Sequence, residues 1–175
     1  MLGPLGHGFM LDGYERIITV GGGTGVFPLY FVQQICRERG IEALAVCGYR
    51  SREESVLREA YSQLGCRTLF AADAGDLDIP GHAGLALEEL LEQLPPIDST
   101  AVLTCGPRPM MQAVADIASQ HGYACQVSLE ERMACGIGVC LVCACKVKQE
   151  AGETGYARCC VDGPVFSAEE VVWES

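Results

Sequence analysis

The sequence predicts an α/β fold in which a parallel, five-stranded sheet is followed by a small C-terminal domain. Two observations support this prediction. Short β-rich runs alternate with helical segments over the first two thirds of the chain, and this alternation is typical of a parallel sheet with helices on both faces. The composition then changes after Ser128, and six of the 11 cysteines lie from Cys135 onward.

The individual elements follow from local composition and periodicity. The predicted strands are β-rich and lie at residues 17–20, 44–47, 68–71, 101–105 and 124–127. The predicted helices carry apolar residues at helical spacing and lie at residues 28–39, 53–64, 85–94 and 109–121. Gly40 ends the first helix, Pro95 and Pro96 close the third, and Gly122 is the predicted C′ residue of the fourth.

Composition restricts the function classes. The chain has 175 residues, and 12 Lys and Arg against 23 Asp and Glu give a net charge of −11. Nucleic-acid binding needs a basic patch, so this charge argues against it. No apolar run reaches the ~18 residues of a membrane span, and residues 1–10 do not resemble a signal peptide. We therefore expect a cytoplasmic protein with reduced thiols, in which a dense cysteine cluster indicates metal binding.

The cysteine cluster has a recognisable spacing. Cys135, Cys140 and Cys143 form a C-x4-C-x2-C pattern, and Cys159 and Cys160 follow. This is the plant-type spacing for a 2Fe-2S cluster, whose fourth thiolate comes from further along the chain. The alternative is structural zinc, although zinc sites usually pair two C-x2-C hooks.

Glycines within the first cysteine loop support the iron–sulfur prediction. Gly136 and Gly138 lie between Cys135 and Cys140. Glycine permits the positive φ angles with which a short loop can wrap a cluster edge and turn its amides toward sulfur. We therefore predict that residues 129–175 form a 2Fe-2S domain.

The remaining cysteines have other interpretations. Cys145 is predicted not to be a cluster ligand, because the plant-type pattern has no place for it. Cys105 differs from the rest because it ends a predicted strand directly before Gly106 and Pro107. The scattered cysteines are predicted to be small buried hydrophobic residues, namely Cys36, Cys47, Cys66 and Cys125.

A glycine-rich loop joins the first strand to the first helix. Backbone amides and a helix N-terminus at such a position can receive a pyrophosphate, which predicts a Rossmann-like dinucleotide-binding domain over residues 15–128. The G-x-G-x-x-G pattern is incomplete, because Val26 occupies the third glycine position, and a tight turn is the alternative. The loop residues are Gly21, Gly22, Gly23, Thr24 and Gly25.

The residues after the second strand bear on NAD against NADP. A carboxylate about 20 residues beyond the loop favours NAD, and an arginine favours NADP. Arg50 and Arg52 follow the strand without a carboxylate at its end. These arginines would favour the 2′-phosphate of NADP, but the sequence alone leaves the choice between NAD and NADP open.

We assign no catalytic residue. The three histidines share no metal-like spacing, and the charged residues before the cluster are predicted to form a solvated turn. The histidines are His7, His82 and His121, and the charged residues are Glu130, Glu131 and Arg132.

These motifs together resemble one family. Residues 21–28 (GGGTGVFP) and 105–111 (CGPRPMM) resemble the two nicotinamide-domain signatures of ferredoxin reductase-like enzymes. Residues 3–9 (GPLGHGF), 128–140 (SLEERMACGIGVC) and 160–166 (CVDGPVF) are similar to the electron-transfer subunit of NAD-dependent (type B) dihydroorotate dehydrogenase. The resemblance runs essentially from end to end.

The resemblance implies particular site residues. The family's cluster ligands correspond to Cys135, Cys140, Cys143 and Cys160, so Cys160 is favoured over Cys159. Its nicotinamide contacts correspond to the loop at 21–25 and to Cys105, Gly106 and Pro107. The chain departs from the family at Ala74, Gly75 and Asp76, where a Gly-Ser pair is usual.

The family also implies FAD and a partner. Its members begin with a flavin-binding barrel, whereas residues 1–14 read as the linker that follows such a barrel. The implied function is electron transfer in pyrimidine biosynthesis, from FMN in a partner catalytic subunit through the 2Fe-2S cluster and FAD to NAD, in a heterotetramer. The alternatives are another iron–sulfur flavin reductase using NAD(P)H and a non-enzymatic four-cysteine zinc module.

Overall fold

The computed structural model describes residues 5–149 and 153–173. In these residues the main sheet has seven strands in the order β4-β3-β2-β1-β5-β6-β9, and β7 and β8 form a separate hairpin. The strands are β1 (Arg16–Gly22), β2 (Glu42–Tyr49), β3 (Arg67–Ala72), β4 (Ile79–Pro80), β5 (Thr100–Cys105), β6 (Ala124–Ser128), β7 (Ala144–Lys148), β8 (Thr154–Arg158) and β9 (Val165–Ser167).

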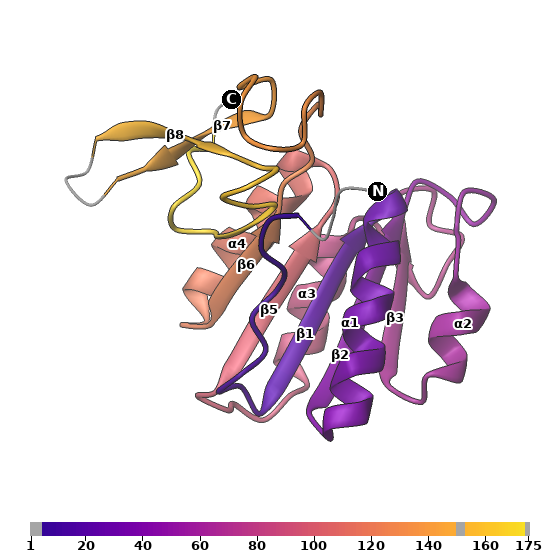
Figure 1. Cartoon of the computed structure of the whole chain (residues 1–175). Coiled ribbons are helices and arrows are strands. Elements are labelled where there is room, and N and C mark those ends of the chain that lie inside the picture. The colour runs from indigo at the N-terminus through magenta and orange to yellow at the C-terminus, as the bar shows by residue number, and fades with distance from the viewer. Residues whose placement is uncertain (1–4, 150–152, 174–175) are drawn as a thin grey trace.

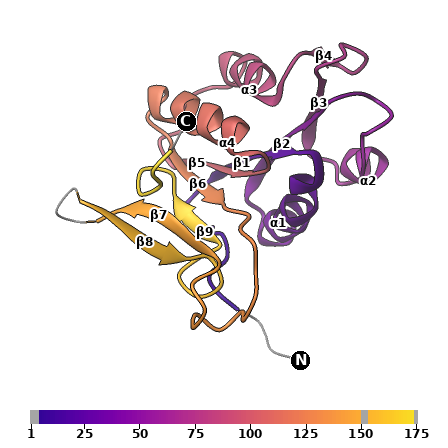
Figure 2. The same cartoon turned by 90° about the horizontal axis from the view of Figure 1, so that it is seen from above.

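Helices cover both faces of the sheet. Helices α1 (Val26–Arg39) and α2 (Arg58–Gln63) lie on one face, and α3 (Ala83–Glu92) and α4 (Arg108–Gln120) lie on the other (Figures 1 and 2). Strands β1 and β5 are buried along their whole length. A parallel sheet covered on both faces requires such apolar central strands, so the predicted α/β class is confirmed.

All five predicted strands are present and pair in parallel. Two short strands extend the sheet beyond the prediction. Strand β4 has only two residues, and β9 has three and pairs antiparallel with β6. Runs this short carry no periodicity, so only their neighbours in space could define them as strands.

The predicted helix at 53–64 is confirmed only in its second half, because residues 53–57 are not helical and α2 begins at Arg58. Leu57 before it has a left-handed backbone, with φ of +57°. The backbone amide of Arg52 donates to the Asp76 carboxylate at 3.0 Å, and its guanidinium donates to the Asp76 carbonyl. These bonds to a distant loop hold the start of the segment in turns, which local periodicity could not indicate.

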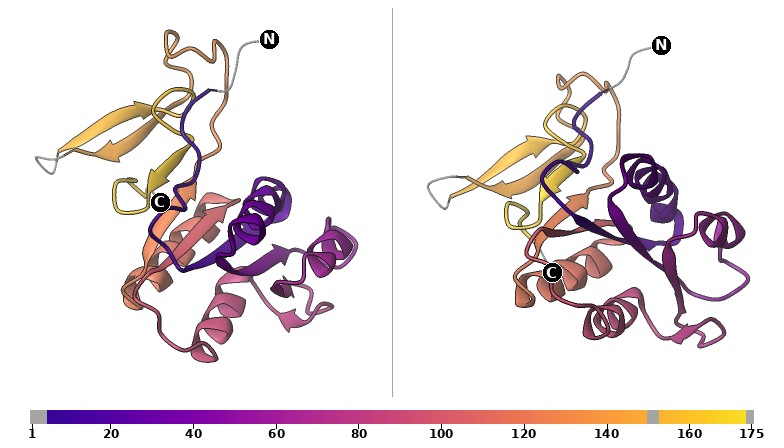
Figure 3. Two further views of the ribbon diagram at one scale, coloured as in Figure 1. Left: turned by 60° about the horizontal axis from the view of Figure 1, so that its bottom comes forward. Right: turned by 90° about the horizontal axis from the view of Figure 1, so that it is seen from below.

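The cysteine-rich C-terminal segment contacts both the sheet edge and the N-terminal segment. Strand β9 pairs with β6 at the sheet edge, and the His7 amide in the N-terminal segment donates to the Gly163 carbonyl at 2.6 Å. The N-terminal segment therefore runs beside the C-terminal one, while the β7–β8 hairpin projects away from the sheet (Figure 3). The predicted linker at 1–14 and domain at 129–175 extend into positions outside the described residues, as do Gly3 and Pro4 of the family motif.

The close approach of Gly25 to β5 yields a stability prediction. A Cβ atom at Gly25 would lie 2.1 Å from the Cys105 carbonyl oxygen, although the Gly25 φ of −61° suits any residue. Gly25→Ala should therefore lower the free energy of unfolding by roughly 1–3 kcal/mol through overpacking. Urea denaturation measures this change.

The matched control is Gly8→Ala, because a Cβ atom there meets nothing within 4 Å. That variant should stay within about 0.5 kcal/mol of the parent chain. Equal stability of the two variants would contradict the steric argument.

Candidate functional site

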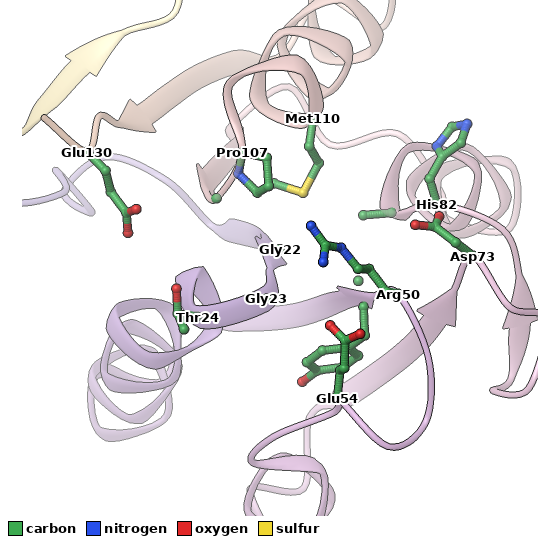
Figure 4. A pocket seen from close by; sticks show the side chains of 14 residues that line it. Gly22, Gly23, Thr24, Arg50, Glu54, Asp73, His82, Pro107, Met110 and Glu130 are labelled. Atoms are coloured by element: carbon green, nitrogen blue, oxygen red, sulfur yellow. The ribbon is translucent and has the colours of Figure 1, made fainter.

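A cavity of about 420 Å³ opens at the carboxyl ends of the central strands (Figure 4). This is where the strand order reverses between β1 and β5, and ligands of open α/β sheets bind at such a point. The cavity has 14 lining residues: Gly22, Gly23, Thr24, Gly48, Tyr49, Arg50, Glu54, Asp73, His82, Ala83, Gly106, Pro107, Met110 and Glu130.

The structure brings the two predicted nucleotide motifs together. Gly22, Gly23 and Thr24 approach the cavity from β1, and Gly106 and Pro107 approach it from the end of β5. The remaining predicted residues do not line the cavity but are buried beside it, and these are Gly21, Gly25 and Cys105.

Position 22 must be glycine because the loops that follow β1 and β5 lie in close contact there. A Cβ atom there would lie 2.5 Å from the Met110 sulfur and 2.9 Å from Cδ of Pro107. Gly106 has a φ of +150°, and its own Cβ would lie 3.0 Å from the Gly22 backbone. The two loops are therefore in direct contact, and side chains at these glycines would force them apart.

The sequence indicated Arg50 as a possible phosphate contact, but it did not indicate Glu54 or Asp73, which also line the cavity. Arg50 follows β2 and Asp73 follows β3, and both point into the cavity with Glu54 close by (Figure 4). A position directly after a parallel strand was the available signal. Glu130 also lines the cavity, and it is exposed, in agreement with the solvated environment that the sequence predicted for it.

His82 lines the cavity for a structural reason. It is the N-cap residue of α3, and its Nδ1 accepts a hydrogen bond from the Leu85 amide at 3.3 Å. The helix start thereby fixes the imidazole at the cavity rim. A histidine in place of the usual Ser, Thr, Asp or Asn cap gave the sequence no clear helix-start signal.

Cys105 presents a neutral thiol beneath the cavity. Burial raises its pKa to about 11, and the nearby charge of Glu130 acts in the same direction. The thiol is therefore protonated at neutral pH, and it contributes packing rather than a nucleophile. Among the scattered cysteines, Cys36, Cys47 and Cys125 are buried as predicted, whereas Cys66 is partly exposed, contrary to the prediction.

The cysteine loop after β6 turns backbone amides toward sulfur. The Cys135 sulfur accepts hydrogen bonds from the amides of Val139 and Cys140, each at 3.4 Å. Gly136 and Gly138 have φ of +70° and +79°, as the predicted wrap requires. Amide donors of this kind stabilise a thiolate, and the backbone bond from Cys140 is the largest cause that lowers the pKa of Cys135 to about 6.

The other cysteines of this region form pairs. A side-chain hydrogen bond with Cys143 raises the pKa of Cys160. Cys145 and Cys159 form a separate buried pair, with 3.6 Å between their sulfurs. The Cys159 thiol is therefore paired with Cys145, although its backbone amide donates to the Cys143 carbonyl at 3.0 Å. The linear spacing did not indicate this thiol pair.

These sulfur contacts do not by themselves bring the predicted cysteine ligands into a metal-binding arrangement. In the described part of the chain, no group of three or more His, Cys, Asp or Glu side chains is arranged to hold a metal ion. The donors nevertheless suit a soft iron centre, since Cys135, Cys140, Cys143 and Cys160 supply four free thiols and the loop supplies amide donors. Among the described residues, no helix has the length and apolar character needed to cross a membrane.

The fold and the cavity are those of a Rossmann-like dinucleotide-binding module with a cysteine-rich extension. The chain belongs to the family of oxidoreductase NAD-binding domains, whose model matches residues 19–116. Residues 130–172 match a second model, the iron–sulfur cluster binding domain of dihydroorotate dehydrogenase B.

Curated relatives extend both matches along the chain. The electron transfer subunits of dihydroorotate dehydrogenase B (NAD(+)) from Caldanaerobacter subterraneus subsp. tengcongensis and Geobacillus thermodenitrificans are 39% and 37% identical to it. Each match covers 98% of this chain, which spans 65% and 64% of the length of those proteins. The resemblance predicted from the motifs is confirmed.

Solved structures agree on the fold. One is a structure of the NADH-dependent reduced ferredoxin-NADP oxidoreductase, which gave insights into flavin-based electron bifurcation. It aligns with a TM-score of 0.84 at 28% identity. That alignment covers 98% of this chain and 59% of the other. The cytochrome b5 reductase domain of Ulva prolifera nitrate reductase aligns with a TM-score of 0.58 at 23% identity, over 69% of this chain and 54% of the other, which supports the fold alone.

The lowered pKa of Cys135 predicts selective reactivity in iron-free protein. A thiol with a pKa of about 6 is mostly thiolate at neutral pH, whereas the buried Cys125, with a pKa of about 12, is not. Alkylation of Cys135 by iodoacetamide should therefore rise as the pH passes through about 6, with Cys125 unmodified. Peptide mass spectrometry after brief labelling measures this order, and earlier labelling of Cys125 would contradict it.

Proposed function

We propose that the chain is the NAD-binding and iron–sulfur part of the electron-transfer subunit of an NAD-dependent dihydroorotate dehydrogenase. The match of residues 130–172 to that enzyme's iron–sulfur binding domain carries the proposal. In this function, electrons from dihydroorotate oxidation at FMN in a partner catalytic subunit pass to NAD+, as a step of pyrimidine biosynthesis. We infer a heterotetramer and a cytoplasmic location, where the 11 free thiols stay reduced.

The cavity is proposed to hold the dinucleotide. The amides of the 21–25 loop, at the N-terminal end of α1, are placed to receive the pyrophosphate. The end of β2, with Arg50, faces the adenosine side, and the nicotinamide side then lies toward Gly106 and Pro107 at the end of β5. The chain's residues bind and orient the cofactor, and we assign no acid or base.

The cysteine region is proposed to hold a 2Fe-2S cluster through Cys135, Cys140, Cys143 and Cys160. When bound, such a cluster supplies one-electron transfer between two-electron flavin chemistry at either side. The amides of Val139 and Cys140 would stabilise its charged sulfurs. FAD is implied by the resemblance, and none of the residues in this chain is proposed to bind it.

A second candidate is another iron–sulfur flavin reductase. The TM-score of 0.84 with the NADH-dependent reduced ferredoxin-NADP oxidoreductase structure favours it, but the 28% identity there is below the 35–39% of the dihydroorotate dehydrogenase relatives. Both candidates include an iron–sulfur centre and a flavin, so the electron donor separates them. Reduction of the holo chain by dihydroorotate, through an FMN-containing catalytic subunit, supports the first candidate; its failure together with reduction by ferredoxin supports the second.

Anaerobic purification with metal analysis and EPR tests the cluster itself. About two irons per chain and a reduced 2Fe-2S signal are expected. About one zinc and no colour would instead support the zinc module and end the electron-transfer proposal.

The pairing of the cysteines predicts unequal effects of two neighbouring substitutions. Cys160→Ser should abolish the 2Fe-2S signal, because it removes a proposed ligand. Cys159→Ser should retain most of the iron, because Cys159 is hydrogen-bonded to Cys145 instead. Iron content and the visible spectrum measure both, and the reverse order would show that the ligand assignment is wrong.

The carboxylates beside Arg50 predict a preference for NADH over NADPH. Glu54 and Asp73 line the proposed adenosine side and would repel a 2′-phosphate. The double substitution Glu54→Gln and Asp73→Asn should raise the affinity for NADPH relative to NADH several-fold, because the carboxylates no longer repel a 2′-phosphate that Arg50 can accommodate. Calorimetric titration measures both affinities, and an unchanged ratio would place the adenosine elsewhere.

A further inference from the structure

Arg158, the last residue of β8, connects two segments that are distant in the sequence. Its Nη1 donates to the Gly138 carbonyl at 3.1 Å. Its Nε and Nη2 donate to the two carboxylate oxygens of Asp162 at 3.0 and 3.2 Å. A forked contact with a carboxylate fixes the guanidinium plane, so the third bond to Gly138 has a defined direction.

Both segments carry proposed cluster ligands. Gly138 lies in the loop between Cys135 and Cys140, and Asp162 lies two residues beyond Cys160. The Arg158 carbonyl also accepts the amides of Val161 and Asp162 at 3.0 and 2.8 Å, which folds the turn around Cys160. Arg158 therefore joins the loop of the first two ligands to the turn of the last.

The contact between these segments is tight. A Cβ atom at Gly138 would lie 2.8 Å from the Val161 side chain and 3.2 Å from Nη1 of Arg158. A backbone hydrogen bond from Gly138 also acts on the Cys160 sulfur. The Gly138 residue thus contacts Arg158 through its carbonyl and Cys160 through its backbone, so a displaced guanidinium would disturb both.

The charge of Arg158 also acts on this site. A four-thiolate 2Fe-2S centre is anionic, and each added electron makes it more negative, so a nearby cation favours the reduced form. The Nη1 atom of Arg158 lies 3.1 Å from the Gly138 carbonyl oxygen, within the loop between Cys135 and Cys140, and this places its charge beside the proposed cluster ligands. Asp162 brings the opposite charge to the same place.

We propose that Arg158 is a positioning residue for the iron–sulfur centre, which fastens the 135–140 loop to the Cys160 turn and raises the reduction potential of the centre. Asp162 orients Arg158 and opposes its electrostatic effect. This inference rests on the proposed cluster and adds two residues that hold it without being ligands.

Three variants of the full chain test the inference, with Arg39→Gln as the control. Arg39 forms an exposed ion pair with Asp12 at 2.9 Å on a different part of the surface. Arg158→Gln removes the charge and the fork, Arg158→Lys keeps the charge, and Asp162→Asn removes the opposing charge at nearly the same size. The readouts are iron per chain, the rate of iron loss to a chelator, and the reduction potential from dye-equilibrated EPR titration.

The reduction potential is expected to shift in opposite directions in Arg158→Gln and Asp162→Asn. Arg158→Gln should lose iron faster and show a more negative potential, and Arg158→Lys should lose iron faster with a smaller change in potential. Asp162→Asn should show a more positive potential, and Arg39→Gln should match the parent chain. If Arg158→Gln retains no iron, the sign of the Asp162→Asn shift decides the electrostatic part.

The inference is overturned if folded Arg158→Gln keeps the parent's iron-loss rate and potential, or if Asp162→Asn shifts the potential downward. A purely structural role would change iron retention in both variants without opposite shifts. The proposed function fails in a different way, namely when the parent chain itself contains no 2Fe-2S signal.

Discussion

The parallel pairing of β1 with β5 is the constraint on which the rest of the molecule depends. It aligns Gly21 with Cys105, so the loops that follow the two strands emerge side by side. Gly25 then packs directly on the Cys105 carbonyl, and Gly106 packs on Gly22. The cavity exists because these contacts leave no room for side chains between the loops and bring α1 and α4 to its two sides.

The sheet also determines where the cysteine-rich segment lies. Strand β6 continues the parallel sheet beyond β5, and β9 pairs with it in the opposite direction. The chain between them, residues 129–164, is thereby anchored at both ends on the edge of the sheet next to the cavity. An electron carrier gains from such an arrangement, because transfer between cofactors depends on a fixed and short separation.

Within that segment, cysteines of similar sequence context have different environments. Cys159 and Cys160 are neighbours in the chain, yet one is paired with Cys145 and the other with Cys143. Both cysteines lie in the turn that follows β8, and within it their thiols meet different partners. The same geometry gives Arg158 its access to the cluster loop, since its side chain bridges the turn that Asp162 closes.

The sequence by itself determined the five parallel strands, because buried strands between helices need continuous apolar runs. The glycine loop at 21–25 and the C-x4-C-x2-C spacing were also readable in the residues themselves, whereas the loop at 105–107 was indicated by the family resemblance. Only the tertiary structure decided that residues 53–57 are not helical, because the preceding Arg52 is hydrogen-bonded to the distant Asp76. Only the tertiary structure added β9 to the sheet. It also decided that Glu130 faces the cavity and that Cys159 is paired with Cys145. These features depend on contacts between residues far apart in the chain. Local composition and periodicity cannot reveal such contacts, because they reflect only neighbouring residues.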